Sequence, residues 1–279
     1  MPTSRAVLVL GMHRSGTSAI ARGLAALGVY LGDEFLEAQP ENPTGYWEDK
    51  GIVDLNERIL KSLGLQWDSV SVIERSALDQ WRIRALRRDA VRYCRRNLAK
   101  RPLWGFKDPR TMRLLPFWQP VLRACDARES YVVAIRSPRS VAASLFARQR
   151  MSDEAAFQLW LAYTIPFLGD LIGKPTVVVD YDLLIAQPHA QLERIGARLR
   201  LPPPDAREVE RFAAEFLDER LRHTVFSPAE TLGEGETARL ASDTYRQLHQ
   251  AASDGVDPHT GSFWQRWEDL LERYTALKR

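Results

Sequence analysis

The chain has 279 residues, 45% of them hydrophobic, and a formal net charge of only +3. That length is enough for one large α/β domain with a substantial core, and the near-even charge argues against a nucleic acid partner. The apolar run 6–10 is too short for a signal sequence or a membrane span, and no later run reaches the ~18 residues of a span. We therefore expect a cytoplasmic protein without a transmembrane segment, with Cys94 and Cys125 as reduced thiols.

Short runs rich in Val and Ile alternate along the chain with longer helical patterns, which is typical of a parallel α/β sheet. Strands are predicted at 6–12, 104–107, 131–136 and 176–180. Helices are predicted at 18–27, 51–63, 79–100, 138–148, 153–172 and 183–198, with loops at 40–47 and 201–205. The predicted fold is a P-loop NTPase-like three-layer α/β sandwich with a central parallel sheet. Residues 1–279 form one domain, with a nucleotide-binding core at 1–200 and a helical or irregular extension at 201–279.

The segment 11–18, GMHRSGTS, follows the first strand and precedes an apolar helix. In such a turn, backbone N–H groups and the positive end of the helix face an anion, and glycines let the backbone approach it. The spacing is that of a Walker A loop, except that Thr17 stands at the lysine position and a cation, Arg14, lies inside the loop. The segment predicts an anion site without the lysine that an ATPase or a kinase uses.

A second anion site is predicted where the strand 131–136 ends. Arg136 lies at the carboxyl end of a strand, where open α/β sheets bind ligands, and Ser137 and Pro138 suit the start of a helix. Ser144 and Arg148 are four residues apart and share one helix face, so they and Arg136 can converge on one phosphate. A capped helix alone would explain Ser137 and Pro138 but not Arg136 together with Ser144.

Both segments resemble motifs of the PAPS-dependent sulfotransferases, in the branch with bacterial carbohydrate and tyrosylprotein enzymes; PAPS is 3′-phosphoadenosine-5′-phosphosulfate. The loop is similar to the PKSGTT or PRSGTT signature, with His13 in place of the usual proline. The resemblance implies that the 5′-phosphosulfate is held by Arg14, Ser15, Gly16, Thr17 and Ser18.

The segment 136–148 resembles the R-x-P-x5-S motif that holds the 3′-phosphate, and it includes the arginine that tyrosylprotein enzymes carry four residues later. The resemblance thus assigns the 3′-phosphate to Arg136, Ser144 and Arg148. The segment 177–188 resembles V-x-Y-E-D-L-x3-P, which implies that Tyr181 hydrogen-bonds the nucleotide. A tyrosine at a strand end that lies half in the core is the alternative for Tyr181.

Sulfuryl transfer needs cations around the sulfuryl oxygens and a base for the acceptor hydroxyl, and the two cations expected here require no metal. Arg14 is one cation; Lys107 is the other, in WGFKDPR, which resembles the K-D-P element of these enzymes. Asp108 either orients Lys107 or caps the next turn. The base is Glu48 or Glu34, each of which is otherwise a solvated surface carboxylate.

Glu48 is favoured slightly as the base because its aromatic neighbours would raise its pKa. His13 is a third candidate. Relatives use a glutamate some 20 to 30 residues beyond the loop, and the lysine-threonine-histidine run of phenol-type enzymes does not occur here.

The prediction is a sulfotransferase that moves the sulfuryl group of PAPS to a hydroxyl of a carbohydrate or small molecule, with 3′,5′-ADP as product. A P-loop nucleotide or small-molecule kinase, or an inactive nucleotide-binding module, is the alternative. Acceptor contacts lie in loops with no transferable code, so acceptor identity and oligomeric state stay open.

Three other features stay open. Residues 82–101 hold nine Lys or Arg and one acid on a helical pattern, with Ile83, Leu86, Ala90, Cys94 and Leu98 inward. This is either a solvated basic face or a patch for an anionic glycan or a phospholipid-linked acceptor. The segment 226–236 is a candidate lid, and Arg222 and His223 are candidates to reach the site from the C-terminal region.

Overall fold

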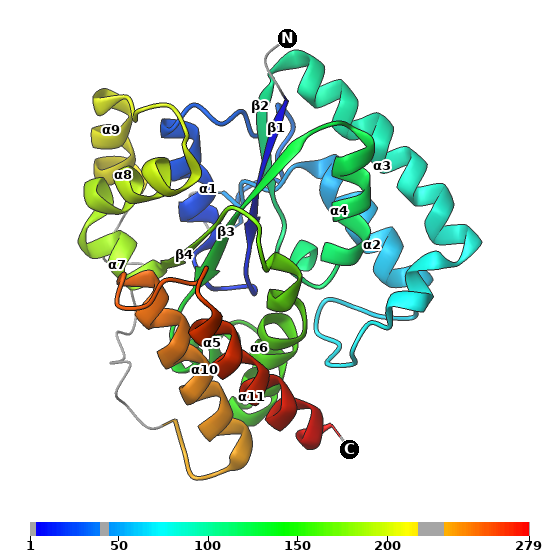
Figure 1. Ribbon diagram of the computed structural model, residues 1–279, viewed down its shortest axis with the longest axis vertical. Helices are drawn as coiled ribbons and strands as arrows, with labels where there is room; N and C mark the ends of the chain where they lie inside the picture. Colours follow the sequence, from blue (N-terminus) through cyan, green and yellow to red (C-terminus); the bar gives the residue numbers. More distant parts are fainter. Residues whose placement is uncertain (1–3, 40–44, 217–231, 279) are drawn as a thin grey trace.

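The computed structural model describes residues 4–39, 45–216 and 232–278 (Figure 1). At its centre is a four-stranded sheet in the order β2-β1-β3-β4, in which all neighbouring strands are parallel. The parallel sheet that the sequence predicted is therefore confirmed. Its strands are β1 (Arg5–Leu10), β2 (Leu103–Lys107), β3 (Arg128–Ile135) and β4 (Thr176–Asp180).

Helices cover both faces of this sheet, because alternate side chains of β1 point in opposite directions. Val7 and Val9 pack on one face, against α1 (Thr17–Ala26), α7 (Tyr181–Ala186), α8 (Pro188–Leu199) and α9 (Ala206–Phe216). Leu8 and Leu10 pack on the other face with the remaining helices. These are α2 (Lys50–Ser62), α3 (Trp81–Lys100), α4 (Leu115–Ala124), α5 (Pro138–Gln149), α6 (Asp153–Leu168), α10 (Glu236–Ala252) and α11 (Gly261–Leu277). The predicted three-layer α/β arrangement is confirmed.

The C-terminal helices pack into the same core. α10 packs against β4 and α6, and α11 packs against α10 and α6 (Figure 1). Tyr245 of α10 and Trp267 of α11 are buried in the cluster that also contains Leu8 of β1. We propose on these contacts that the chain is one domain, in which 1–200 is the nucleotide-binding core and 201–279 is an extension fixed to it.

Two helix predictions were wrong in instructive ways. The single helix predicted at 183–198 is two, α7 and α8, because Pro188 has no N–H to continue the first and instead begins the second. No element was predicted at α4, which carries Pro116 in its first turn and Pro120 inside. Proline is tolerated in a first turn, and burial of Phe117, Trp118 and Val121 supplies the stability that propensity lacks.

The other predicted boundaries lie within a few residues of those observed. The segments 75–79 (η1, Arg75–Asp79) and 169–171 (η3, Gly169–Leu171), predicted in part as α-helix, are short 3₁₀ helices, as is η2 (Pro109–Met112). Of the predicted loop 40–47 and the candidate lid 226–236, residues 40–44 and 226–231 lie outside the described residues. Arg222 and His223 lie outside them too.

Candidate active site at the carboxyl edge of the sheet

Each of the four strands ends at the same edge of the sheet, and each is followed by a segment that the sequence singled out. The loop 11–18 follows β1, Lys107 ends β2, Arg136 follows β3 and Tyr181 follows β4. The chain leaves β1 toward β2 on one side and leaves β3 toward β4 on the other, so the gap between β1 and β3 is a topological switch point. Open α/β sheets bind their ligands at such points.

Three residues of the loop after β1, Gly11, Arg14 and Gly16, have positive φ angles. Gly11 and Gly16 have φ values of 140° and 77°. A Cβ on Gly11 would lie 2.5 Å from the carbonyl oxygen of Ala134, and one on Gly16 would lie 2.1 Å from Cδ2 of Tyr181. Both glycines are therefore required by conformation and by close approach.

The loop also contains a buried hydroxyl group, that of Ser15. Ser15 is only 1% exposed, and its Oγ has no hydrogen-bond partner among the described residues. Gly16 begins α1 without a side-chain cap, so the first N–H groups of this helix receive no side-chain acceptor. A buried donor and uncapped helical N–H groups together suit an anion.

The two anion segments predicted from sequence meet directly. Nε of Arg14, in the loop after β1, donates to Oγ of Ser144 on α5 over 2.7 Å. The two residues are 130 positions apart in the chain, and the register of β1 beside β3 brings their loops together. The structure thus places a loop cation against a hydroxyl of the second site.

Arg136 directly follows β3 and lies against Tyr181, which follows β4. Arg136 is 8% exposed, and its guanidinium carbon lies 4.7 Å from the ring centroid of Tyr181. Among the described residues, no carboxylate pairs with Arg136 and its Nε has no hydrogen-bond partner. A buried cation without a counter-charge is costly, so this position suits an anionic ligand.

Tyr181 is held over the loop by a buried carboxylate. Asp180 is fully buried and accepts from the backbone N–H of Asp182 at the start of α7 over 2.8 Å. Its other oxygen accepts from the hydroxyl of Tyr245 over 2.8 Å and lies 3.1 Å from Nδ1 of His249, both on α10. Burial, and then Asp180, raise the pKa of Tyr245, so this phenol stays a donor. Helix α10 therefore fixes the end of β4.

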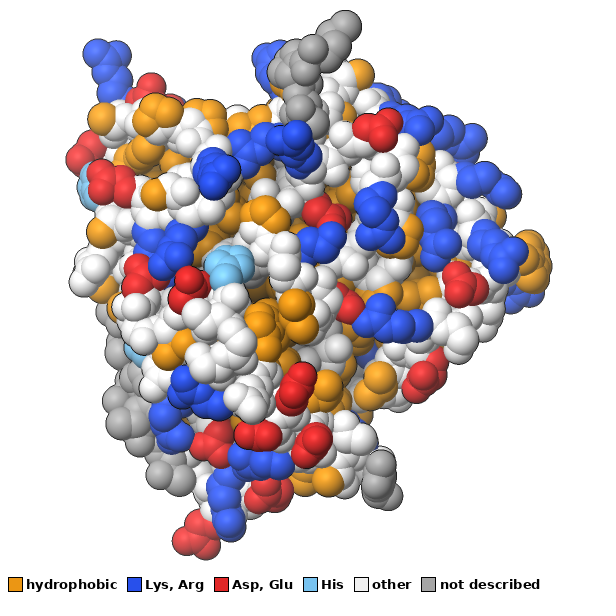
Figure 2. All heavy atoms as spheres, in the orientation of Figure 1, with side chains coloured by type: hydrophobic (Ala, Val, Ile, Leu, Met, Phe, Trp, Pro, Cys, Tyr) orange, Lys and Arg blue, Asp and Glu red, His pale blue; other side chains and the backbone are white. Residues whose placement is uncertain are grey.

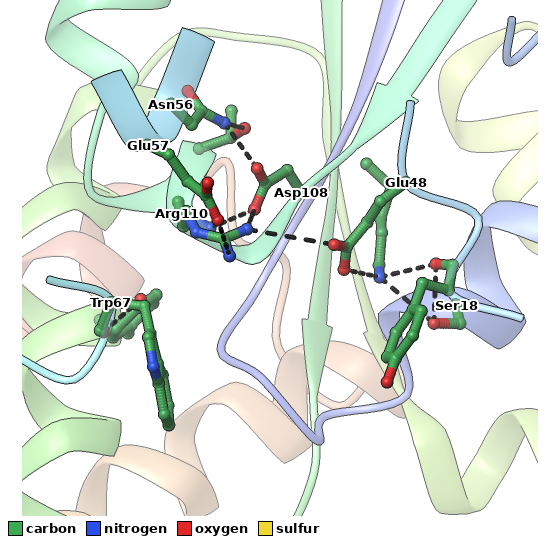
Figure 3. A network of polar contacts seen from close by, with 11 residues as sticks. Ser18, Glu48, Asn56, Glu57, Trp67, Asp108 and Arg110 are labelled. Atoms are coloured by element: carbon green, nitrogen blue, oxygen red, sulfur yellow. Dashed lines mark hydrogen bonds and ion pairs between the residues drawn. The ribbon is translucent and has the colours of Figure 1, made fainter. Parts of the chain in front are cut away.

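A buried ion pair lies on the other side of the loop. Nζ of Lys107 donates to Oε1 of Glu48 over 2.6 Å, to the carbonyl oxygen of Tyr46 over 2.8 Å and to Oγ of Ser18 over 3.2 Å. Lys107 is 2% exposed and Glu48 is 6% exposed. Burial raises the pKa of Glu48 and Lys107 opposes the rise, so the net direction is the one expected from sequence. Figure 3 shows Glu48 between Arg110 and Ser18.

Glu34 lies elsewhere. It is exposed, and its backbone carbonyl accepts from the N–H of Lys50 beside the bridge between Phe35 and Asp49. Among the described residues its side chain has no hydrogen bond or ion pair. Of the two glutamates proposed from sequence, the structure brings Glu48 to Lys107.

Arg110 is a cation of this site that the sequence analysis missed. Its NH1 donates to Oδ1 of Asp108 over 2.9 Å and lies 4.0 Å from Oε2 of Glu48, while NH2 donates to Glu57 over 3.0 Å. Its position three residues after Lys107, directly after the K-D-P element, was the signal that would have identified it.

Asp108, fully buried, positions Arg110. It caps η2 by accepting from the backbone N–H of Arg110 over 3.0 Å, the capping role that the sequence left open. Its Oδ2 accepts from Nδ2 of Asn56, whose Oδ1 accepts from Nε1 of Trp118 over 2.8 Å (Figure 3 labels Asn56 and Asp108). The network links α2 and α4 to the site.

His13 lies against an aromatic wall. Its ring centroid is 4.8 Å from that of Trp67 and 5.8 Å from that of Tyr163, and its Nε2 is buried without a partner among the described residues. Burial and four nearby cations hold the pKa of His13 well below its usual range, which keeps the imidazole neutral at neutral pH. The four cations, which therefore gather around the loop, are Arg110, Lys107, Arg148 and Arg14.

In the described part of the chain, no three His, Cys, Asp or Glu side chains are grouped so as to hold a metal ion. Nor is any helix of that part long and apolar enough to cross a membrane.

Fold and site together define a parallel α/β protein with a glycine-containing loop at the switch point and several cationic side chains around that loop. No family model and no curated protein matches the chain. Among solved structures, the chain is similar to the "Sulfotransferase Domain from the Synechococcus PCC 7002 Olefin Synthase", with 18% identity and a TM-score of 0.49. The match covers 88% of this chain and 96% of that one. At a TM-score below 0.5, the function proposed below rests on this chain's own residues.

Proposed function

We propose that the protein is a PAPS-dependent sulfotransferase that moves a sulfuryl group to an acceptor hydroxyl and releases 3′,5′-ADP. The observation that carries the proposal is the hydrogen bond of 2.7 Å between Arg14 and Ser144. It joins the loop that resembles a 5′-phosphosulfate site to the segment that resembles a 3′-phosphate site. PAPS, unlike ATP, carries phosphate at both the 5′ and the 3′ position, so one donor would occupy both.

The residues at these positions fit such a donor. The unpartnered Oγ of Ser15 and the uncapped start of α1, at Gly16, Thr17 and Ser18, suit the 5′-phosphate. The unpaired guanidinium of Arg136 suits the 3′-phosphate, with Ser144 and Arg148 on the facing helix α5. Tyr181, stacked on Arg136, would contact the nucleotide between them. No metal is needed for these contacts.

The ion pair of Lys107 and Glu48, beside the loop, would carry out the chemical step. PAPS supplies the sulfuryl group; the acceptor oxygen forms a bond to sulfur while the bond from sulfur to the 5′-phosphate oxygen breaks. Glu48 would take the proton of the acceptor hydroxyl, since its burial raises its affinity for a proton. Lys107 and Arg14 would stabilise charge on the sulfuryl and bridging oxygens. Glu34 stays the second candidate for the base.

We propose a carbohydrate or other small molecule as acceptor, as in the bacterial carbohydrate branch, in a cytoplasmic enzyme that does not act on nucleic acid. Aromatic side chains close to Glu48 in the chain support this choice of acceptor. Tyr46 and Trp47 directly precede Glu48, and the rings of Phe35 and Trp47 lie 5.4 Å apart. Aromatic faces beside a catalytic carboxylate suit a sugar ring.

The donor can be tested by thermal shift. We expect 3′,5′-ADP to stabilise the protein by about 2.7 kcal/mol at ~100 times its Kd, and ATP with magnesium to have little effect. Stabilisation by ATP with magnesium alone would instead support a P-loop kinase.

The chemistry can be tested with labelled PAPS and a panel of sugar and phenol acceptors. Glu48→Gln should keep the 3′,5′-ADP shift and lose transfer by 100-fold or more, the lower end of general base contributions of about 10² to 10⁴. Glu34→Gln, the same change at the second candidate, should keep both if Glu48 is the base. Wild-type turnover in Glu48→Gln would remove Glu48 as the base. Donor binding without transfer to any acceptor would favour an inactive nucleotide-binding module.

A further inference from the structure

The outer face of α3 carries a row of cations that the proposed active site does not use. Trp81 and the arginines that follow it at intervals of three or four residues lie on one side of the helix, namely Arg84, Arg88, Arg92 and Arg95. The opposite side is buried in the core, as the sequence predicted, through Ile83, Leu86, Ala90, Cys94 and Leu98. The row runs from Trp81 to Arg95, so at ~1.5 Å per residue it extends over about 21 Å of the helix.

Little within the chain neutralises this row. Arg92 pairs with Asp89 over 2.6 Å, and Arg95 donates to the backbone carbonyl of Ala124 over 2.7 Å. Arg84 and Arg88 are exposed and have no ion-pair or hydrogen-bond partner among the described residues. Figure 2 shows Lys and Arg side chains spread along the edge of the molecule where α3 lies. Since the whole chain carries only +3, this charge is a local feature.

The row begins with an exposed aromatic side chain. Trp81, the first residue of α3, is 74% exposed. The guanidinium carbon of Arg82 lies 5.3 Å from the Trp81 ring centroid. Most of the Trp81 ring faces solvent at the start of the basic row, where it is accessible to a partner that contacts the row.

We propose that the outer face of α3 docks on a membrane surface of anionic phospholipid. Arg84, Arg88 and their neighbours would lie at the lipid phosphates, and Trp81 would enter the interfacial region, where tryptophan is preferred. Charge complementarity alone also fits a nucleic acid or an acidic glycan. The exposed Trp81 distinguishes the membrane, because an apolar anchor beside a basic face is how peripheral helices bind lipid. The proposal is independent of the enzymatic function.

The test is co-sedimentation of the full chain with vesicles of phosphatidylcholine, with and without phosphatidylserine. We expect binding only to the anionic vesicles, and weaker binding at high salt. At about tenfold per 1.4 kcal/mol and about 1 kcal/mol per basic residue, Arg84→Glu with Arg88→Glu should weaken binding at least 30-fold. Trp81→Ala should also weaken it, by an amount that salt does not change.

The matched control reverses two exposed arginines on other helices, Arg207→Glu with Arg266→Glu, and should bind like wild type. Unchanged melting temperatures would show that the α3 variants fold. Equal binding of the α3 double variant and this control would overturn the proposal. The proposal would also be overturned if the wild-type protein stayed in solution with anionic vesicles. It would be overturned too if the protein bound duplex DNA more tightly than vesicles and Trp81→Ala did not weaken vesicle binding.

Discussion

The buried pair of Lys107 and Glu48 makes a prediction that needs no substrate. At 2.6 Å and an effective dielectric constant of ~20, their attraction is about 6 kcal/mol before the cost of burial is subtracted. Removing one partner leaves the other charge buried and unpaired, which typically costs about 3 to 5 kcal/mol. Lys107→Met should therefore lower the free energy of unfolding by about that amount at pH 7, or the melting temperature by roughly 10 °C.

The loss of stability in Lys107→Met, relative to wild type, should become smaller as the pH falls. Burial already raises the pKa of Glu48, and loss of Lys107 removes an interaction that opposes the rise. Between the unfolded and the folded pKa, the folded state binds the proton more tightly, so stability falls as pH rises through that window. Lys107→Met should thus regain stability relative to wild type as pH falls below the folded pKa of Glu48.

Chemical denaturation of four proteins measures the pair: wild type, Lys107→Met, Glu48→Gln and the double variant. The double variant should be more stable than the sum of the two single losses predicts, by about 3 kcal/mol. Lys100→Met, which breaks the exposed pair with Asp33, is the control and should change the melting temperature little. Additive losses in the double variant, or a deficit independent of pH, would refute the reasoning.

Three further variants test the site. Arg136→Ala should weaken the binding of 3′,5′-ADP by about 10- to 100-fold in calorimetric titration, as expected for a charge-assisted hydrogen bond of ~1.5 to 3 kcal/mol. The binding of adenosine 5′-phosphosulfate should be nearly unaffected. Equal losses of affinity for the two nucleotides would remove the assignment of Arg136 to the 3′-phosphate. Gly16→Ala should abolish nucleotide binding, because its Cβ would overlap Tyr181; retained binding would contradict this. Asn56→Leu should lower the free energy of unfolding in urea by about 1 to 3 kcal/mol, because it leaves Oδ2 of Asp108 without the amide donor of Asn56; an unchanged free energy of unfolding would contradict this.

Much of the site edge was predictable because it depends on local pattern. Arg136 and Tyr181 follow short buried runs rich in Val, and the ends of parallel strands share one edge whatever the helices between them do. The loop 11–18 was likewise predictable from its glycines and its position between a strand and a helix. The strand order β2-β1-β3-β4, which was not predicted, is what brings Arg14 to Ser144.

Other parts depend on tertiary contacts that no local pattern contains. The sequence favoured Glu48 over Glu34 only slightly; what separates them in the structure is the short pairing of Phe35 with Asp49, which leaves Glu34 exposed while Glu48 reaches Lys107. Arg110 enters the site only because Asp108 and Asn56 hold η2 in place. The helix α4 escaped prediction because its prolines mask a strongly buried apolar face.

The central claim is that two anion sites at neighbouring strand ends hold one doubly phosphorylated adenosine. A crystal structure with 3′,5′-ADP measures this directly. We predict the 5′-phosphate within hydrogen-bond distance of Ser15 and Gly16, and the 3′-phosphate within reach of Arg136 and Ser144. A nucleotide bound in one piece with Arg136 facing away from it, or bound at another edge of the sheet, would contradict the claim.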